Sequence, residues 1–295
     1  MYEKLAHCPL CKSEHFTNYM VVKDHSISKE SFSICKCSHC DFLFTNPRPT
    51  KENTEKYYSS ENYISHKDKT TNLTNLLYKI VRKFTLKKKV KWLNENTNSR
   101  GRLLDFGCGT GKFLRSAEKD GWKAVGLEPN KEAASMAIQR HGSKVFSTLS
   151  ELEGEKKFDA ITLFHVLEHV HNLKSTLDFL LSKLKKRGSL FIAVPNFHSY
   201  DAEFYKENWA ALDVPRNLYH FTPQTMEVLA KEFGLNIKST KPLIFDSYYV
   251  SILSESYINN KKKLINPILI GNKSNRIARK TNNNYSSLLY ILKKL

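Results

Sequence analysis

The sequence has no long hydrophobic run: no apolar stretch among its 295 residues approaches the roughly 20 residues needed to span a bilayer. Its N-terminus lacks the basic start, apolar segment and small cleavage-site residues of a secretory signal peptide. It also has no internal repeat and no low-complexity linker long enough to separate independent domains. These absences argue against a membrane-spanning protein and a repeat array, and we expect a cytoplasmic protein.

Acidic residues are scarce relative to basic ones, since Lys+Arg number 47 and Asp+Glu 29, for a formal net charge of +18. A charge of this size is typical of proteins that bind nucleic acid or anionic lipid. The sequence nevertheless lacks a dense arginine stripe, and its scattered lysines are typical of a solvated surface. We therefore favour an ordinary basic surface and keep nucleic acid as the alternative partner.

The six cysteines do not form a pattern typical of a disulfide framework. Four of them form two Cys-x-x-Cys pairs, Cys8 with Cys11 and Cys37 with Cys40, a spacing typical of four thiolates around one zinc ion. Such a closed site leaves no open coordination position, so we expect a structural zinc that stabilises residues 1–49, a segment too short for a large core. Alternative or poorer candidate ligands are Cys35, which would replace Cys37, and His7, His15 and His39.

A glycine-rich turn follows an apolar segment near the middle of the chain. Residues 103–111 read Leu-Leu-Asp-Phe-Gly-Cys-Gly-Thr-Gly, a helical pattern follows at 112–119, and residues 124–127 form a second short strand that leads into Glu128. Strand, glycine turn, helix, strand and acid in this order are typical of the nucleotide-binding half of a doubly wound α/β domain. Glycine allows a tight turn and the close approach of a ligand to the backbone. Within the turn, Cys108 is expected to be a small packing residue rather than a nucleophile.

The two acids of this segment indicate which ligand the turn binds. Asp105 lies two residues before the first glycine, where a carboxylate repels phosphate but attracts an ammonium or sulfonium group. Glu128, at the tip of the second strand, is placed to accept hydrogen bonds from both hydroxyls of a ribose. The Gly-x-Gly-x-Gly spacing also differs from the dinucleotide form Gly-x-Gly-x-x-Gly. The segment therefore predicts a cationic ligand rather than a pyrophosphate.

The chain downstream continues the alternation of strands and helices. Residues 158–164 form an apolar run of strand length, leucines at 173–184 have helical spacing, and residues 189–196 are the next buried strand. Cations and a glycine at 185–188 predict the end of that helix. We therefore predict an α/β fold with a Rossmann-like, seven-stranded, mostly parallel sheet, helices on both faces, and a small zinc-ribbon-like module before it. Ligands of such sheets lie beyond the carboxyl ends of the strands. We therefore expect one ligand-binding opening at this edge of the sheet, here called the mouth, lined by Asp105, Glu128, His165 and Asn196.

The predicted organisation has four parts. They are a zinc-ribbon-like module at 1–49, a linker and amphipathic helix at 50–98, a cofactor-binding core at 99–245 that includes a substrate or lid loop at 197–222, and a C-terminal helix and last strand at 246–295. The helix at 72–93 is strongly basic, and we expect its apolar face to pack over the sheet, with a membrane or RNA surface as the alternative. In the last part we expect an edge strand at 236–245, a helix at 246–257, a mobile lysine- and asparagine-rich excursion at 259–284 and a strand at 286–292.

Residues 105–111 and Glu128 resemble the first motif and the ribose-binding acid of the class I S-adenosylmethionine-dependent methyltransferases. The resemblance implies that S-adenosyl-L-methionine is the cofactor. The cofactor-binding residues that it implies are Asp105, Gly107, Gly109, Gly111, Glu128, Pro129 and Phe164. Methyl transfer needs in-line alignment and the exclusion of water, and it needs a base only when an O–H or N–H nucleophile must lose its proton.

A second stretch, residues 208–223, concentrates aromatic, acidic and basic side chains in one loop, and Thr222-Pro223 at its end predicts the start of a helix. Together with the cysteine pairs, this loop resembles that of a bacterial methyltransferase group with an N-terminal Cys-x-x-Cys zinc module and a Trp…Pro-Arg-His-Leu-Tyr-His-Phe loop. The resemblance covers essentially the whole chain and implies methylation of a sugar, a lipid or another secondary metabolite. Asn217 stands where the group usually has histidine. If that histidine is the base elsewhere, this chain must use another group or needs none.

Candidate site residues come from this loop and from the strand ends. The predicted bases are His220 and His165, followed by His169 and His198, of which His169 is more often a structural residue. The predicted substrate-binding residues are Trp209, Arg216, Tyr219 and Asn196. Arg216 is suited to an anionic substrate group, or equally to an ion pair with Asp213 that stiffens the loop.

Three functions are consistent with these patterns. The leading hypothesis is methyl transfer to a small-molecule or lipid- or nucleotide-linked sugar-type acceptor, with a quinone-like acceptor in the same class. The alternatives are an RNA methyltransferase, which the basic charge and the zinc module favour, and a non-catalytic zinc-ribbon adaptor, which the intact glycine turn and Glu128 oppose.

Overall fold

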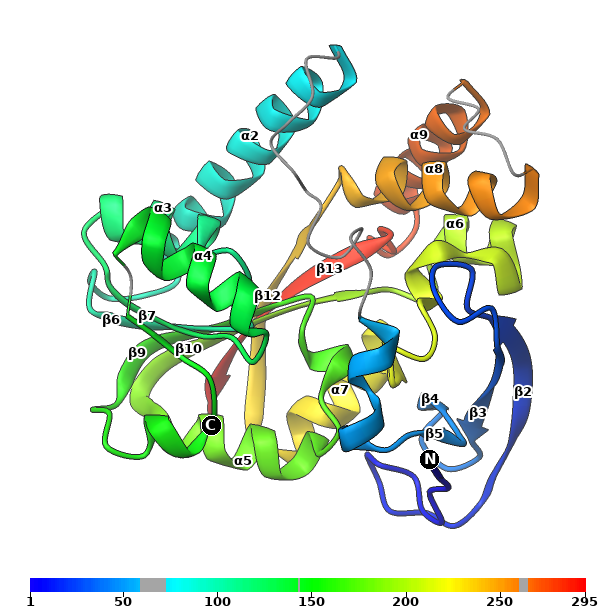
Figure 1. Ribbon diagram of the computed structural model, residues 1–295, viewed down its shortest axis with the longest axis horizontal. Helices are drawn as coiled ribbons and strands as arrows, with labels where there is room; N and C mark the ends of the chain where they lie inside the picture. The colour runs from blue at the N-terminus through cyan, green and yellow to red at the C-terminus, as the bar shows by residue number, and fades with distance from the viewer. Residues whose placement is uncertain (59–72, 143, 260–264) are drawn as a thin grey trace.

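The computed structural model describes residues 1–58, 73–142, 144–259 and 265–295, and Figure 1 shows their arrangement. A seven-stranded sheet runs through the molecule in the order β12-β13-β10-β9-β6-β7-β8. Neighbouring strands are parallel except at β13, which is antiparallel to both of its neighbours. In this order the strands are β12 (Leu235–Pro242), β13 (Ser287–Lys294), β10 (Leu184–Pro195), β9 (Phe158–Phe164), β6 (Arg102–Phe106), β7 (Lys123–Leu127) and β8 (Lys144–Phe146). The predicted seven-stranded, mostly parallel sheet is confirmed, and β12 is an edge strand as expected.

Helices cover both faces of this sheet (Figure 1). They are α2 (Leu73–Glu95), α3 (Lys112–Lys119), α4 (Lys131–His141), α5 (Leu173–Lys183), α6 (Tyr200–Tyr205), α7 (Pro223–Glu232), α8 (Asp246–Asn259) and α9 (Ile265–Lys280). Short 3-10 turns are η1 (Lys51–Asn53), η2 (Glu55–Tyr57), η3 (Ser150–Leu152), η4 (Leu167–His169), η5 (Lys206–Asn208) and η6 (Ala210–Leu212). Within the described ranges, none of the helices combines the length and the apolar character that crossing a bilayer requires.

The alternation of side chains along the strands explains the two covered faces. In β6, Leu103 belongs to a buried cluster with Trp92 of α2 and Phe113 of α3. The next residue, Leu104, belongs to the opposite cluster, which also contains Leu177 of α5. Strand β6 therefore buries both of its faces, as expected for a central strand of a parallel sheet between two layers of helices.

The N-terminal cysteine segment forms a second, smaller sheet in the order β11-β4-β3-β2. Three of its strands belong to the segment itself, but the fourth, β11, comes from the loop that precedes α7. Its strands are β2 (Phe16–Lys23), β3 (Ser31–Cys37), β4 (Leu43–Thr45) and β11 (Tyr219–His220), and a separate two-stranded ribbon pairs β1 (Tyr2–Glu3) with β5 (Arg48–Pro49). The small sheet is thus completed by the chain that follows β10, at the right of Figure 1.

The core of the small sheet is continuous with the rest of the molecule. On one side, Phe42 and Phe44 belong to the same cluster as Leu190 of the large sheet. On the other side, Ile34 packs in a cluster with Trp209 and with Val250 of α8. The cysteine segment is therefore clamped between the sheet and the C-terminal helices.

Two sequence predictions differ from the observed elements. The helix predicted to end through 185–188 stops at Lys183, and β10 begins at Leu184, which pairs with Phe158. Leu184 is fully buried against β9, and this packing favours an extended backbone over another turn of helix. The excursion expected at 259–284 contains α9, which buries Gly271 and Ala278, and a Cβ on Gly271 would meet Tyr248 of α8 at 2.9 Å. The close packing of α9 on α8 favours a helix in this segment. Residues 260–264 lie outside the described ranges.

Other predicted elements are found where they were expected. The helix after the glycine turn is α3, and the helix that begins at Thr222-Pro223 is α7, whose N-cap Thr222 accepts a hydrogen bond from the backbone N–H of Thr225. The predicted C-terminal helix and strand are α8 and β13. The basic helix predicted at 72–93 is α2, which packs on the sheet through Val90 and Leu93. The side chains of its first turns lie outside the described residues.

Candidate active site

The glycine turn between β6 and α3 has the backbone that its sequence predicts. Gly107, Gly109 and Gly111 all have positive φ angles, of 73°, 53° and 75°, a region that favours glycine. A Cβ on Gly107 would lie 2.4 Å from a methyl group of Val166. The Gly107 N–H donates to the carbonyl of Leu127 at 2.7 Å, which fixes the turn against β7. The turn is therefore held in one conformation at the carboxyl edge of the sheet.

The two predicted acids lie beside this turn. Glu128 accepts hydrogen bonds from the backbone N–H groups of Gly109, at 2.8 Å, and Asn130, at 2.9 Å. Asp105 is buried at the end of β6 and accepts a hydrogen bond from the Thr162 hydroxyl at 2.7 Å. Burial raises the pKa of Asp105 to about 7, against the opposing effects of the Thr162 hydrogen bond and of a nearby lysine, Lys89. Burial also raises the pKa of Glu128, against its backbone hydrogen bonds.

Cys108 is a packing residue, as expected. Its side chain is buried, and its Sγ would lie 2.6 Å from a Cβ on Gly126 of β7. Burial raises the pKa of the thiol, and the charges of Asp105 and Glu128 raise it further. The protonated thiol fills the space that the missing Gly126 side chain leaves.

A lysine of α2, Lys89, lies at the same mouth, a role that the sequence did not predict for this helix. The Lys89 Nζ lies 3.9 Å from the centroid of the Phe164 ring, and Phe164 packs edge-on against Phe113 of α3. Burial lowers the pKa of Lys89, while the charges of Asp246 and Asp105 oppose that shift. The mouth thus combines two carboxylates with one cation over an aromatic ring.

His165 stands between two carboxylates at the tip of β9. Its Nε2 lies 3.2 Å from Asp246 Oδ2 at the start of α8, and its Nδ1 lies 3.6 Å from Glu168 Oε1 in η4. The backbone φ of His165 is 58°, a conformation that a residue other than glycine adopts at a cost. Burial opposes a charged ring, but the hydrogen bonds and charges of Asp246 and Glu168 raise the pKa of His165 to about 9. The imidazole is therefore held in one orientation by two acids.

Asp246 could not have been found from sequence spacing, because it follows β12 and reaches His165 only through the fold. Its side chain is partly exposed, and burial raises its pKa, but the hydrogen bond and charge of His165 lower it overall. Thr162, the partner of Asp105, was missed because it lies inside the buried strand β9.

The four predicted zinc ligands come together at one point. The thiol groups of Cys8, Cys11, Cys37 and Cys40 all lie within 4.8 Å of one another. The Sγ atoms of Cys8 and Cys40 are 3.7 Å apart, and those of Cys11 and Cys37 are 3.6 Å apart. Tetrahedral coordination with Zn–S bonds of about 2.3 Å places neighbouring sulfurs about 3.8 Å apart, so the geometry fits this metal. Cys35 lies elsewhere and contacts Asn18 and the carbonyl of Asn46.

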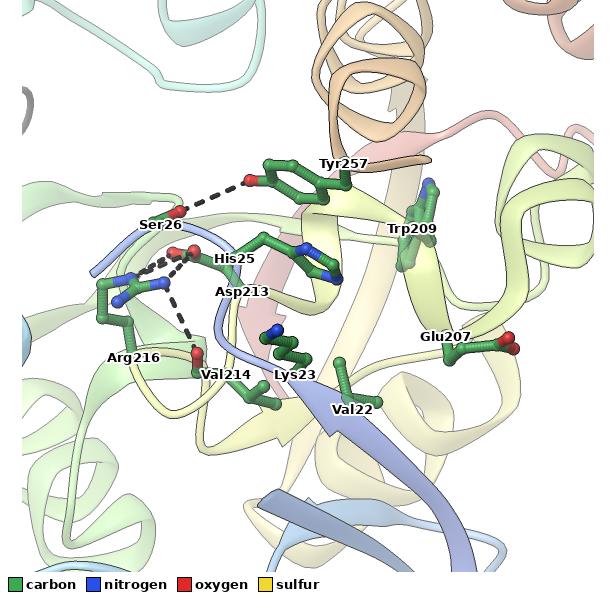
Figure 2. Close-up of a pocket in the computed structure, with 10 residues that line it drawn as sticks. All are labelled: Val22, Lys23, His25, Ser26, Glu207, Trp209, Asp213, Val214, Arg216 and Tyr257. Atoms are coloured by element: carbon green, nitrogen blue, oxygen red, sulfur yellow. Dashed lines mark hydrogen bonds and ion pairs between the residues drawn. The ribbon is translucent and has the colours of Figure 1, made fainter. Parts of the chain in front are cut away.

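The loop predicted to bind the substrate makes many of its contacts inside the protein, next to the small sheet. Arg216 is buried, and its Nη2 lies 2.7 Å from Asp213 and 2.9 Å from Asp24 of the cysteine segment. Figure 2 shows the guanidinium turned toward Asp213 and Val214. Burial opposes its charge, but the two acids raise the pKa of Arg216. The predicted Asp213–Arg216 pair is confirmed.

The other predicted substrate residues also have partners inside the protein. Trp209 is buried and donates to Asp201 at 2.8 Å. Tyr219 stacks on Phe42, with ring centroids 5.7 Å apart, and its hydroxyl donates to the carbonyl of His171. Asn196 is 1% exposed and donates through its amide to the carbonyl of Tyr285. Their substrate-binding role stays a prediction.

The remaining histidine candidates are His220, His169 and His198. His220 belongs to β11, is 4% exposed, and has its Nε2 3.3 Å from the Thr45 hydroxyl; burial lowers its pKa to about 3. His169 Nδ1 lies 3.0 Å from the carbonyl of Arg216, the structural role expected of it. His198 is exposed. Asn217, which stands where the similar methyltransferase group usually has histidine, is buried and donates to the carbonyl of Ala211. This residue therefore joins two parts of the loop.

The fold is an α/β domain, and the mouth contains a glycine turn and two carboxylates, Glu128 and the buried Asp105. These are the features expected of a protein that binds a cationic nucleoside. The chain matches the family described as "Methyltransferase domain" over residues 79–240, more than half of its length, and it belongs to that family. Its glycine turn and its fold are likewise those of S-adenosylmethionine-dependent methyltransferases.

The similar proteins agree with this assignment. The "Ubiquinone biosynthesis O-methyltransferase" of Rickettsia prowazekii (strain Madrid E) is 28% identical over 170 residues, which cover 52% of this chain and 66% of the relative. The mitochondrial protein of the same description from Dictyostelium discoideum is 27% identical over 169 residues, 49% of this chain and 52% of the relative. The chain thus spans about half to two thirds of the length of these curated relatives.

Two solved structures share the fold. The magnesium protoporphyrin IX methyltransferase of Synechocystis PCC 6803 with bound SAH has a TM-score of 0.55 at 14% identity, over 83% of this chain and 100% of that chain. The plantazolicin methyltransferase in complex with SAH has a TM-score of 0.52 at 15% identity, over 82% of this chain and 94% of that chain.

Proposed function

We propose that the protein transfers the methyl group of S-adenosylmethionine to the hydroxyl oxygen of a small-molecule acceptor, with His165 as the general base. The observation that carries this proposal is the position of His165 beside the glycine turn: Asp246 holds its Nε2 at 3.2 Å, and its Nδ1, 3.6 Å from Glu168, is the nitrogen that accepts the hydroxyl proton. Only a nucleophile that carries a proton needs such a base. The curated relatives, which are named as O-methyltransferases, support oxygen as the acceptor atom.

The relatives named for ubiquinone biosynthesis favour a quinol-like acceptor over the sugar-type acceptor, which remains the alternative. The pKa of His165, raised to about 9 by Asp246 and Glu168, is also closer to that of a phenol, about 10, than to that of an unactivated hydroxyl, about 16 for water. Release of SAH with a catechol, a demethylated quinol and a nucleotide sugar as acceptors tests the choice.

The cofactor is proposed to bind with its ribose at Glu128, its amino-acid part between Asp105 and Lys89, and its remaining contacts at the other residues that the motif implies. Asp105 suits the ammonium group, and Lys89 suits the carboxylate. The Gly109 N–H already fixes the Glu128 carboxylate in place. The Phe164 ring, which packs edge-on against Phe113, completes this side of the mouth.

Two substitutions are expected to distinguish the contact with the cofactor's ribose from the contact with its carboxylate. Glu128→Ala should weaken binding of both SAH and 5′-methylthioadenosine by about 10- to 100-fold, because both carry the ribose. Lys89→Met should weaken SAH binding by a similar factor and leave 5′-methylthioadenosine unchanged, because only SAH carries the carboxylate. Isothermal titration calorimetry measures both. Equal effects of Lys89→Met on the two ligands would contradict the assignment of Lys89.

The pH dependence of methyl transfer is expected to follow His165. Because the ring must lose its proton to act as a base, kcat/KM should rise with pH toward about 9. Asp246→Asn removes a charge that raises the pKa of His165, so the midpoint should move to lower pH, by roughly one to two pH units. Initial rates of SAH formation between pH 6 and 10 give the profile. An unchanged midpoint in the variant would exclude His165 as the titrating base.

The cysteine group is proposed to hold one structural zinc ion. The sulfur separations fit tetrahedral coordination, and four thiolates leave no position for a substrate. The metal would fix the two loops that carry the cysteine pairs, and it takes no part in the transfer step.

A further inference from the structure

A groove of about 800 Å³ runs between α2 and α3, outside the cofactor mouth. Seven of its lining residues are cations, four from α2 and three from α3, and two are acids. The cations are Arg82, Lys83, Lys87, Lys91, Lys112, Arg115 and Lys119. Glu95 pairs with Lys91, Arg115 pairs with Glu118, and Asp120 pairs with Arg100 outside the lining, so cations still outnumber acids in the groove.

The floor of the groove is apolar and fixed. Leu86 and Val90 line it, and both pack on the buried cluster that includes Trp92 and Phe113 beneath them. The first and last cations are nine positions apart on α2 and seven apart on α3, so the two rows are about 14 Å and 10 Å long at 1.5 Å per residue. The groove therefore has an apolar floor between two cationic walls of similar length.

We propose that this groove docks an acidic amphipathic α-helix of a partner protein. Two turns of an α-helix are about 11 Å long, which matches the length of the two rows of cations. The apolar stripe of such a helix covers Leu86 and Val90, while acids on both sides of the stripe face the two rows of cations. The inference concerns a partner, not the methyl acceptor, and it holds whatever the acceptor is.

The shape and chemistry of the groove favour a helix over two other anionic partners. A bilayer surface is flat and does not fill a concave groove between two helices. A nucleic-acid backbone would pair with the cations but leave the apolar floor uncovered, and the groove lining contains no aromatic side chain on which a base would stack.

The test uses a fluorescein-labelled 15-residue helical peptide with leucines along one face and glutamates on both sides of them. A second peptide of identical composition has its order scrambled so that no apolar stripe forms. Fluorescence anisotropy with the full-length protein should give at least about tenfold tighter binding of the striped peptide, since 1.4 kcal/mol corresponds to a factor of ten. Equal affinity for both peptides would overturn the proposal, because only the net charge would then be recognised.

Charge reversal locates the binding surface. The Lys87→Glu/Lys119→Glu double variant places one change on each wall and should weaken the striped peptide by about tenfold or more. The matched control, Lys156→Glu/Lys238→Glu, makes the same change in net charge at exposed residues outside the groove and should leave binding within about twofold. Equal losses in the two variants would overturn the assignment of the groove. So would a 15-nucleotide RNA or an anionic phosphatidylglycerol vesicle that binds more tightly than the striped peptide and loses that binding in the groove variant.

Discussion

Replacing Cys37 by serine is expected to abolish zinc retention and to lower the temperature of thermal unfolding by about 10 °C or more. Structural zinc contributes about 10–16 kcal/mol to the folding of zinc-finger peptides, as much as the whole stability of many domains. Cys37 is fully buried, its Sγ is 3.6 Å from that of Cys11, and it ends strand β3. Metal analysis by mass spectrometry and differential scanning calorimetry measure the two effects.

Cys35→Ser is the matched control for this prediction. Cys35 lies two residues away in the same strand and is also buried, but its thiol contacts Asn18 and Asn46 rather than the cysteine group. The control should keep about one zinc ion per chain. If Cys35→Ser loses the metal while Cys37→Ser retains it, the assigned ligand set is wrong.

Loss of the metal is expected to reach beyond the cysteine segment. Phe42 follows the second cysteine pair and stacks on Tyr219, and the Thr45 backbone N–H donates to the carbonyl of Leu218. Strand β11 therefore loses its partner when β4 unfolds. The loop at 208–223 and the cysteine segment should therefore unfold as one cooperative unit in the calorimetric trace.

The parts of the site that lie close together in sequence could be predicted from it. Asp105, the three glycines and Glu128 lie within one strand–turn–helix–strand unit, and each residue type has a local physical reason for its place. The cysteine pairs are likewise paired by spacing, and the structure selects Cys37 over Cys35. Local geometry is enough in both cases, because the ligand-binding groups are carried on short turns.

The parts that depend on distant contacts could not be predicted. The loop at 208–223 combines the residue types of a binding site, yet Arg216 and Tyr219 face Asp24 and Phe42, almost two hundred residues earlier. A buried ion pair and an exposed anion-binding arginine have the same sequence signature. Conversely, Lys89 lies in a run of lysines and Asp246 at the start of a helix, and only the packing of α2 and α8 against the sheet brings them to the mouth.

Replacing His165 by asparagine is expected to lower kcat by about 10²- to 10⁴-fold, the usual contribution of a positioned general base. Asparagine is chosen because His165 has a φ of 58°, and asparagine adopts the left-handed region more readily than alanine does. The variant should therefore keep the turn after β9 and bind SAH within about threefold of the wild type, since the ring itself contacts Asp246 and Glu168 rather than the glycine turn. Single-turnover rates with saturating cofactor isolate the chemical step from binding.

Two outcomes of this experiment distinguish a base from a residue that only supports the fold. If His165 acts as the base, the rise of kcat/KM with pH disappears in His165→Asn, whereas a purely structural defect lowers the rate at every pH and keeps the profile. An acceptor with an already ionised oxygen should also lose less activity in the variant than a phenol does, because no proton remains to be removed. If His198→Asn rather than His165→Asn abolishes the profile, the exposed histidine beyond β10 is the base, and the carboxylate pair around His165 serves only to hold α8 against the sheet.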